Sequence, residues 1–246
     1  MKNQYFGDIN DYRKYGLLRA IVRASGLSLY VAWMLTPDDG GSDGKFVSYL
    51  DDPERWKSYD LELYCALRGF MRDKEPRRVS MIESTDLLPK TKCFSEVVPD
   101  AGLERDEWFR QLLVSARDFD FIFLDPDNGL EIKSKPYGRK KSSKYLYWRE
   151  IEELWSSGMS LLIYQHFIHE NRCGFIQRLL AKLQSKTPGS LVEAFSTPNV
   201  VFLMALQPEH HCFHQAIVND VRKRWQEQVR HWELVRHTGQ DGPTLG

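Results

Sequence analysis

The chain has 246 residues, of which 42% are hydrophobic, and its 34 basic residues are balanced by 34 acidic ones. This neutral balance gives no overall electrostatic attraction to nucleic acid, so only the distribution of charge along the chain can indicate such a partner. The length suits one large α/β domain better than two small ones, and we predict a single domain over residues 1–246.

The four cysteines are widely spaced and show no C-x-x-C or similar ligand pattern. This usage predicts reduced thiols and argues against a structural zinc site. The first ten residues lack the apolar core of a signal peptide, and no run of about 18 apolar residues occurs. We therefore expect a soluble, cytoplasmic protein without membrane contact.

Helical spacing predicts a helix over residues 10–24, within an N-terminal helical motif that covers residues 1–26. Residues 27–35 have the composition of a buried strand and lead into a loop rich in glycine and aspartate. In doubly wound folds such a loop follows the first strand and lets backbone amides approach a cofactor. The candidate cofactor residues here are Thr36, Asp38, Asp39 and Gly40.

A second helical segment covers residues 51–73, with Pro53 and acidic residues near its start. A short strand is expected next, over residues 77–84. An acidic side chain at the end of the second strand can hydrogen-bond ribose hydroxyls, which makes Glu83 a further cofactor candidate. Its alternative is an exposed glutamate without a ligand.

The most informative stretch is residues 119–133, FDFIFLDPDNGLEIK, preceded by a third strand over residues 94–98 and a helix over 105–118. An apolar strand ends here in Asp125 and Asp127, with turn-forming residues between and after them. Buried carboxylates are costly unless they bind or react with something. A hairpin turn with solvated acids is the alternative.

Residues 133–145 are the most basic part of the chain, with six lysines and arginines in thirteen positions. Proline, glycine and two tyrosines among them predict an irregular, mobile loop that contacts phosphate, although a solvated loop has the same composition. The candidate nucleic-acid contacts are Lys133, Lys135, Arg139, Lys140, Lys141 and Lys144.

A helix over residues 147–158 precedes a fifth strand that ends near His166. This histidine is a candidate ligand or general base, and the alternative is a hydrogen-bonded structural residue. After another helix, two apolar runs separated by Pro198 and Asn199 predict antiparallel neighbours. A charged helix over residues 214–235 and a frayed tail over 239–246 complete the chain. His210, His211 and His214 lie between the last strand and that helix, and we expect them away from the site.

These elements predict an α/β fold with a mostly parallel sheet, a final antiparallel strand and helices on both faces, as in Rossmann-like methyltransferases. Ligands of open α/β sheets bind beyond the carboxyl ends of the strands. That rule gathers the residues that follow the first, second, fourth and fifth strands at one edge.

Two motifs resemble the bacterial ribosomal-RNA large-subunit adenine-N6 methyltransferases. Residues 7–15, GDINDYRKY, are similar to the family's Gly-Asn-x-Ala-Asp-x-x-Lys-His pattern through Gly7, Asp11 and Lys14. Residues 125–128, DPDN, stand where the family has its catalytic Asp-Pro-Pro-Tyr. The Thr36–Gly40 loop is similar to the family's S-adenosylmethionine loop in its threonine and glycine.

The resemblance implies S-adenosylmethionine as cofactor, with Lys14 among its contacts, and transfer of a methyl group to a base amine of nucleic acid. The candidate catalytic residues are Asp125, Asp127, Asn128 and His166. Asn128 cannot stack on a base as tyrosine does. Asp127 adds a negative charge that also suits a cationic group or a metal ion.

Two other functions remain open. A metal-dependent nuclease would use Asp120, Glu131 and Lys133, with Asp125 as a further Mg²⁺ ligand, and requires residues 130–133 to pair antiparallel with residues 121–124. A nucleic-acid-binding module with an altered methyltransferase site would bind without turnover, and its affinity would weaken with salt.

Overall fold

The computed structural model describes residues 1–41, 44, 46–72 and 76–235, so the expected tail over 239–246 lies outside the described residues. Within them, seven strands form one sheet in the order β2-β1-β3-β6-β8-β7-β9. The first four strands in this order run parallel, β8 is antiparallel to both β6 and β7, and β9 is antiparallel to β7. The predicted α/β, Rossmann-like fold is confirmed.

The central strands are short, apolar and buried, as their sequences predict. The strands of the main sheet are β1 (Leu29–Ala32), β2 (Thr91–Phe94), β3 (Phe121–Leu124), β6 (Ser160–His166), β7 (Leu191–Ser196), β8 (Val200–Leu206) and β9 (Arg230–Glu233). A separate parallel pair consists of β4 (Gly129–Leu130) and β5 (Tyr145–Leu146).

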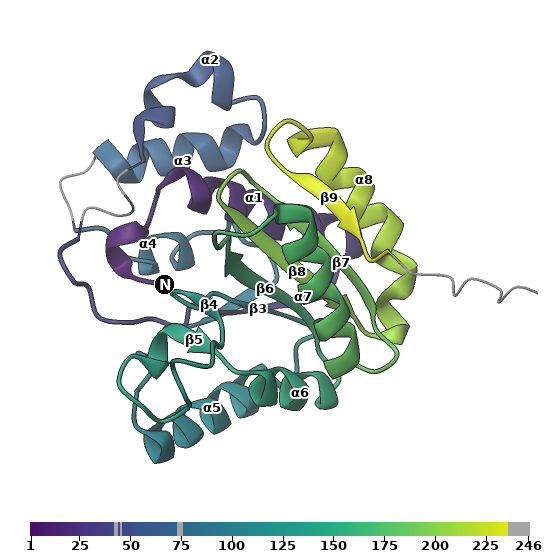
Figure 1. Cartoon of the computed structure of the whole chain (residues 1–246). Coiled ribbons are helices and arrows are strands. Elements are labelled where there is room, and N and C mark those ends of the chain that lie inside the picture. The colour runs from purple at the N-terminus through teal and green to yellow at the C-terminus, as the bar shows by residue number, and fades with distance from the viewer. Residues whose placement is uncertain (42–43, 45, 73–75, 236–246) are drawn as a thin grey trace, which may run out of the picture.

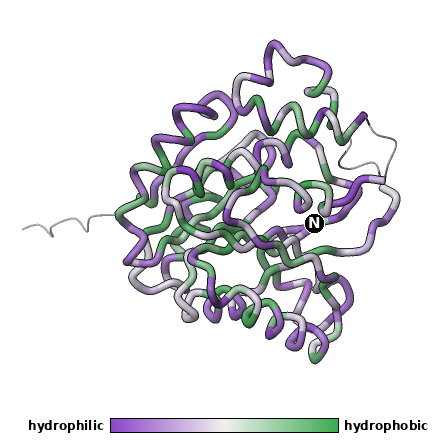
Figure 2. Tube along the Cα trace, turned by 180° about the vertical axis from the view of Figure 1, so that it is seen from behind, coloured by the Kyte–Doolittle hydropathy of each residue, from purple (hydrophilic) through white to green (hydrophobic). Residues whose placement is uncertain are grey.

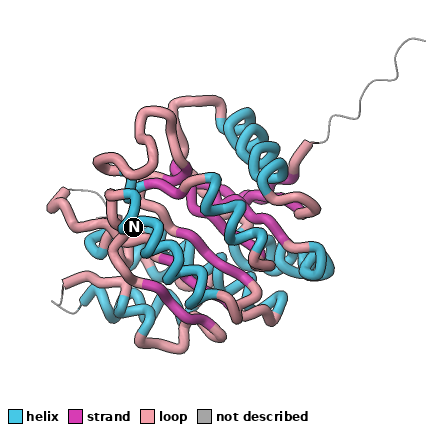
Figure 3. Tube along the Cα trace, turned by 90° about the horizontal axis from the view of Figure 1, so that it is seen from below, coloured by secondary structure: helices cyan, strands magenta, loops and turns pink. Residues whose placement is uncertain are grey.

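Helices cover both faces of the sheet (Figures 1 and 3). The longer ones are α1 (Ile9–Ser25), α3 (Leu61–Arg72), α5 (Gly102–Ala116), α6 (Trp148–Ser156), α7 (Arg172–Lys186) and α8 (His214–Trp225), and the short ones are α2 (Pro53–Trp56) and α4 (Ser80–Glu83). The 3₁₀ turns are η1 (Asn3–Tyr5), η2 (Ser48–Asp51), η3 (Ser142–Lys144) and η4 (Pro208–Phe213).

Two apolar cores lie on opposite sides of the sheet because successive strand residues point to opposite faces. One core joins the sheet to α1, α3 and α8, and the other joins it to α5, α6 and α7. Apolar segments converge on the strands in Figure 2, while the outer helices alternate polar and apolar residues. Gly16 of α1 permits close packing against α8, because a Cβ there would come within 2.0 Å of the Trp225 ring.

Two elements differ from the prediction. Residues 77–84 do not form a strand, because Val79 and Ile82 are buried at helical rather than alternating spacing, and Glu83 ends the short helix α4. The edge strand is instead β2, three residues earlier than the predicted run over 94–98, with Val97 adding an isolated bridge to Leu35.

The C-terminal helix is also shorter than predicted. α8 ends at Trp225, and the chain turns back to add β9 along the open edge of β7. Strand pairing and the hydrogen bond from Trp232 Nε1 to Ser196 Oγ (2.8 Å) favour the strand there. Tertiary contacts of this kind override local helix propensity.

Candidate functional site

A pocket of about 450 Å³ opens at the carboxyl ends of β3 and β6. Residues that follow these strands meet the N-terminal residues there, so the strand-end rule holds for this chain. Its polar lining comprises Tyr5, Asp8, Asn10, Asp11, Lys14, Asp125, Asp127, Asn128, Tyr164, His166 and Asn199. Four of these side chains are carboxylates and one is a lysine, so acceptors outnumber donors.

Lys14 holds the centre of this pocket. Its Nζ lies 2.6 Å from Asp11 Oδ1 and 2.7 Å from Asp125 Oδ2, and all three side chains are almost fully buried. Burial lowers the pKa of Lys14, but the two carboxylates raise it more, so its pKa lies above the usual value. The lysine is therefore charged and fixes the carboxylate of Asp125 at the end of β3.

Asp8 begins α1 and adds a further acid to the pocket. Its side chain caps the helix by accepting from the backbone N–H groups of Asn10 (2.8 Å) and Asp11 (2.9 Å). Burial and the nearby charge of Asp11 raise the pKa of Asp8 to about 7. Burial raises the pKa of Asp11 as well, despite its contact with Lys14. This wall of the pocket thus gains or loses a proton near neutral pH.

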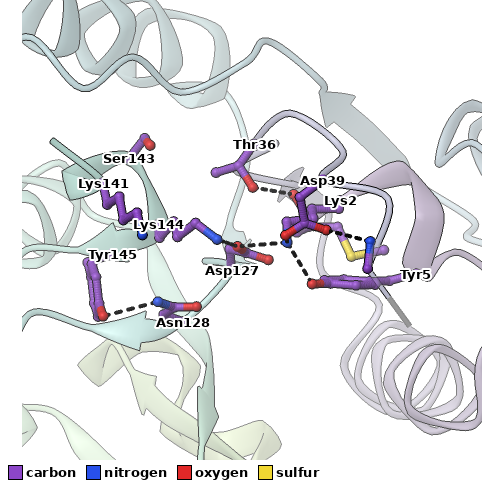
Figure 4. Close-up of polar contacts among 12 residues, drawn as sticks. Lys2, Tyr5, Thr36, Asp39, Asp127, Asn128, Lys141, Ser143, Lys144 and Tyr145 are labelled. Carbon is purple, nitrogen blue, oxygen red and sulfur yellow. Dashed lines mark hydrogen bonds and ion pairs between the residues drawn. The ribbon is translucent and has the colours of Figure 1, made fainter. Parts of the chain in front are cut away.

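Asp127 lies between two lysines from distant parts of the chain (Figure 4). Its Oδ2 is 2.9 Å from Lys144 Nζ and 3.8 Å from Lys2 Nζ, and its side chain is 2% exposed. Burial raises the pKa of Asp127, but the α-amino group of Met1 and these lysines lower it more, so the net pKa is below its usual value. Asp127 is therefore ionised, in contrast with Asp8.

Asn128 is oriented by one hydrogen bond. Its Nδ2 donates to the Tyr145 hydroxyl at 3.0 Å, which leaves the amide oxygen as the free acceptor (Figure 4). Asn10 Oδ1 is a second amide oxygen in the pocket lining, and it is buried without a hydrogen-bond partner in the described structure. Buried acceptors are rarely left unpaired, so this atom indicates a missing donor.

His166 ends β6 at the rim of the pocket. It is exposed, and its ring packs edge-on against Tyr164 with 5.1 Å between ring centroids. Tyr164 is buried, and burial together with the Asp125 charge raises the pKa of its hydroxyl well above the usual value. All four expected catalytic residues, Asp125, Asp127, Asn128 and His166, therefore line the same pocket.

The expected cofactor residues do not gather there, apart from Lys14. Asp38 Oδ1 accepts from Gln4 N, and Asp39 is paired with Lys2 at 2.5 Å. The amide of Gly40 donates to Gln4 Oε1 at 3.2 Å. The loop after β1 is thus bound to the N-terminal segment.

The crevice between β1 and β3 is filled by Met1. The Met1 α-amino nitrogen donates to the carbonyl oxygens of Met34 (3.2 Å) and Asp125 (2.9 Å), and Thr36 N donates to Met1 O (2.9 Å). Strand order reverses direction at this crevice, where Rossmann-like folds hold their cofactor. The polar groups that would contact S-adenosylmethionine at this crevice are thus paired with N-terminal residues.

Glu83 lies apart from the pocket. Its Oε1 accepts from Trp33 Nε1 at 2.6 Å and from Ser95 Oγ at 2.5 Å, so it links α4 to the strands β1 and β2. The expectation that it follows a strand was wrong because α4 replaces that strand.

The basic segment over residues 133–145 is anchored on α5. Asp100 accepts from the backbone amides of Lys141 and Ser143, both at 2.8 Å, and the Tyr137 hydroxyl donates to Asp106 at 2.6 Å. Lys144 turns inward to Asp127, while Lys133, Arg139, Lys140 and Lys141 are exposed and Lys135 is half-buried. The mobility of this segment stays a prediction. Its Lys144 contacts Asp127 of the pocket lining and so brings the segment next to the pocket.

The nuclease arrangement is contradicted by the strand pairing. β3 pairs with β1 and β6, and Leu130 pairs in parallel with Leu146, so the required antiparallel hairpin does not form. Asp120 precedes β3 and accepts from Ser28 at the amino end of the strand, opposite Asp125. Glu131 accepts from Trp148 N at 3.3 Å. Asp120 and Asp125 therefore lie at opposite ends of β3 and cannot share one metal ion.

Several pocket residues were not expected from the sequence. Asp8 and Asn10 line the pocket but are not among the candidate site residues that the sequence indicates, and neither is Lys2, which pairs with Asp127. A signal for Asp8 existed: Asp8, Asp11 and Lys14 are spaced by three, which places them on one face of a helix. No signal in the sequence indicated Lys2, because its contacts with Asp39 and Asp127 are made only in the folded chain.

No protein-family model and no curated protein matches this chain. Among the described residues, no helix combines the length and the apolar character needed to cross a membrane.

Proposed function

We propose that this chain is a methyltransferase-like protein that binds nucleic acid and takes an amine-bearing base into the pocket between α1 and the ends of β3 and β6. The observation that carries the proposal is the unpaired, buried Oδ1 of Asn10 in an acceptor-rich pocket. Adenine, cytosine and guanine carry an exocyclic amine that donates hydrogen bonds, whereas uracil does not.

Two acceptors support this choice. The amide oxygens of Asn10 and Asn128 belong to the same pocket lining, and Asn128 is oriented by Tyr145. Asp125 is already paired with Lys14, so we assign it a role in positioning Lys14 and not in contacting the base. The exposed lysines and arginine of the 133–145 segment would supply phosphate contacts near the pocket rim.

The test compares single-stranded homopolymers of adenine, cytosine and uracil by fluorescence anisotropy at fixed salt. We expect adenine or cytosine strands to bind more tightly than uracil strands. Asn10→Ala should weaken the binding of the preferred strand about tenfold, the value of one hydrogen bond of about 1–1.5 kcal/mol. Asn219→Ala, an exposed asparagine of α8, is the matched control. Equal binding of all three strands by wild type would reject the proposal.

Methyl transfer to the bound amine is the second candidate function. The strand order, with β8 inserted antiparallel between β6 and β7, supports it, because this order is typical of Rossmann-like methyltransferases. The paired groups at the end of β1 count against a ready cofactor site. Isothermal titration with this cofactor separates the candidates: heat at millimolar cofactor shows cofactor binding and supports methyl transfer, and its absence leaves base binding alone.

A further inference from the structure

A second polar cluster lies far from this pocket, where β9 pairs with β7. Glu193 of β7 and Glu233 of β9 are direct cross-strand neighbours, and His231 lies two residues from Glu233 on the same face. Like charges placed directly opposite each other destabilise a strand pair. This arrangement therefore needs a positive charge to compensate it.

The three side chains converge. One ligand atom from each of Glu193, His231 and Glu233 lies within 4.8 Å of the others. Glu193 Oε2 and His231 Nε2 are 3.2 Å apart, and these side chains are 4% and 5% exposed. That separation is close to the edge of a tetrahedron around Zn²⁺, about 3.3 Å for ligands at about 2.0 Å.

Both of these atoms lack a hydrogen bond. Glu193 Oε2 and His231 Nε2 are buried without a hydrogen-bond partner in the described structure, although they lie 3.2 Å apart. The other oxygen of Glu193 is held by His214 Nε2 of α8 at 2.7 Å, which fixes the carboxylate toward His231. Outer partners of this kind orient the ligands of metal sites.

We propose that Glu193, His231 and Glu233 bind one Zn²⁺ ion, with His214 positioning Glu193 from the outer shell. One imidazole and two carboxylates are ligands that zinc accepts, and three protein ligands leave a fourth position for water. The ion replaces the repulsion between the two glutamates by attraction and joins β9 to β7. A neighbouring pocket lined by Glu193, His214 and Glu233 gives water and the ion access.

Arg222 opposes this site in the metal-free chain. Its Nη2 lies 3.2 Å from His231 Nδ1, and because arginine only donates, Nδ1 accepts and the ring proton belongs on Nε2. Zinc binding displaces the proton from Nε2, Nδ1 becomes protonated, and the exposed Arg222 side chain moves away. Removing Arg222 should therefore tighten zinc binding, an effect that a purely structural role of His231 would not produce.

The experiment measures the thermal midpoint of the full chain with and without Zn²⁺, in a background where the exposed cysteines Cys65, Cys173 and Cys212 are serine. At a zinc concentration about 100 times the dissociation constant, the midpoint should rise by about 5–10 °C. Glu233→Gln, at an exposed position that tolerates the change, and His231→Asn should abolish most of this shift.

Two further measurements decide the result. Arg222→Ala should lower the zinc dissociation constant at least severalfold by equilibrium dialysis, and Co²⁺ should give the visible absorption of a four-coordinate site that Glu233→Gln removes. His169→Ala, an exposed histidine elsewhere, should leave the shift unchanged. A zinc shift that persists in both Glu233→Gln and His231→Asn, or no shift in the parent protein, would overturn the proposal.

Discussion

Two buried ionic clusters in this protein have opposite balances of charge. On the α5–α6 side of the sheet, Arg105 and Glu150 form one matched pair through two hydrogen bonds of 2.8 and 3.0 Å, and both side chains are 1% exposed. At the carboxyl end of the sheet, Lys14 faces two carboxylates, and Asp8 adds a third acid nearby.

This difference in charge balance distinguishes a pair that stabilises the fold from a cluster that marks a candidate functional site. Glu150 also accepts from Tyr147 N at the start of α6, and Arg105 Nη2 donates to Tyr145 O, so the matched pair connects α5, β5 and α6. In the Lys14 cluster, burial and the neighbouring carboxylates raise the pKa of Asp8 and Asp11 beside an open pocket. Perturbed acids in a pocket mark candidate functional sites.

The largest expected effect belongs to the matched pair. Arg105→Met should lower the free energy of unfolding by about 3–5 kcal/mol, because it leaves the Glu150 carboxylate buried without its partner. Urea unfolding at pH 7 measures this change. Arg110→Met on the same helix is the control, since Arg110 is exposed and its pair with Glu107 lies at the surface. A loss no greater than that of the control would remove the structural role assigned to Arg105.

Lys14→Met should have a smaller effect on stability, and one that depends on pH. Without the cation, the pKa of Asp11, which burial already raises, rises further in the folded state, so the folded chain holds a proton that the unfolded chain releases. Stability then falls as the pH increases, by about 2–4 kcal/mol at pH 8 and less at pH 5. Urea unfolding at both pH values measures it, with exposed Lys57→Met as control. An equal loss at pH 5 and pH 8 would contradict the charge argument.

Asp8→Asn should change stability in the opposite direction. The folded pKa of Asp8, about 7, is above its ordinary value of 3.8, so ionising it costs more in the folded chain than in the unfolded one. In wild type this cost grows as the pH rises from about 4 to about 7. Asparagine keeps the helix cap and removes the titration.

The variant should therefore be more stable than wild type at pH 8, by about 1 kcal/mol or more, with little difference at pH 4. Thermal or urea unfolding across this pH range gives the comparison. Because Asp8 and Asp11 interact, the titration that disappears belongs to the pair. If wild-type stability does not fall between pH 4 and pH 7, the raised pKa of Asp8 is wrong.

The sequence predicted most of the sheet and half of the pocket. Apolar strands followed by polar residues located Asp125, Asp127, Asn128 and His166 at one edge, since the strand-end rule depends only on topology. The sequence did not predict the strand β9 or the contacts of Lys2, because both depend on partners that are distant in the chain. Because a helix was predicted where β9 lies, the sequence also did not indicate the Glu193–His231–Glu233 cluster, which forms only when residues 230–233 pair with β7.

The smallest expected effect concerns the exposed charges of the 133–145 segment. Arg139 and Lys140 are exposed, and neither side chain makes an ion pair with a described residue, so the double alanine variant should unfold like wild type. Its affinity for single-stranded nucleic acid should fall. The slope of log K against log salt should decrease by about 1.4, which is about 0.7 for each phosphate that the variant no longer neutralises.

Binding isotherms at several salt concentrations measure this slope, and Lys92→Ala with Lys223→Ala is the control pair at exposed positions on β2 and α8. Asn10→Ala should lower the affinity for amine-bearing bases without changing the slope, since it contacts no phosphate in the proposed complex. The two variants thus separate charge attraction at the rim from base recognition within the pocket. A slope that falls equally in the control pair would show that binding is spread over the whole surface and would exclude a specific role for the 133–145 segment.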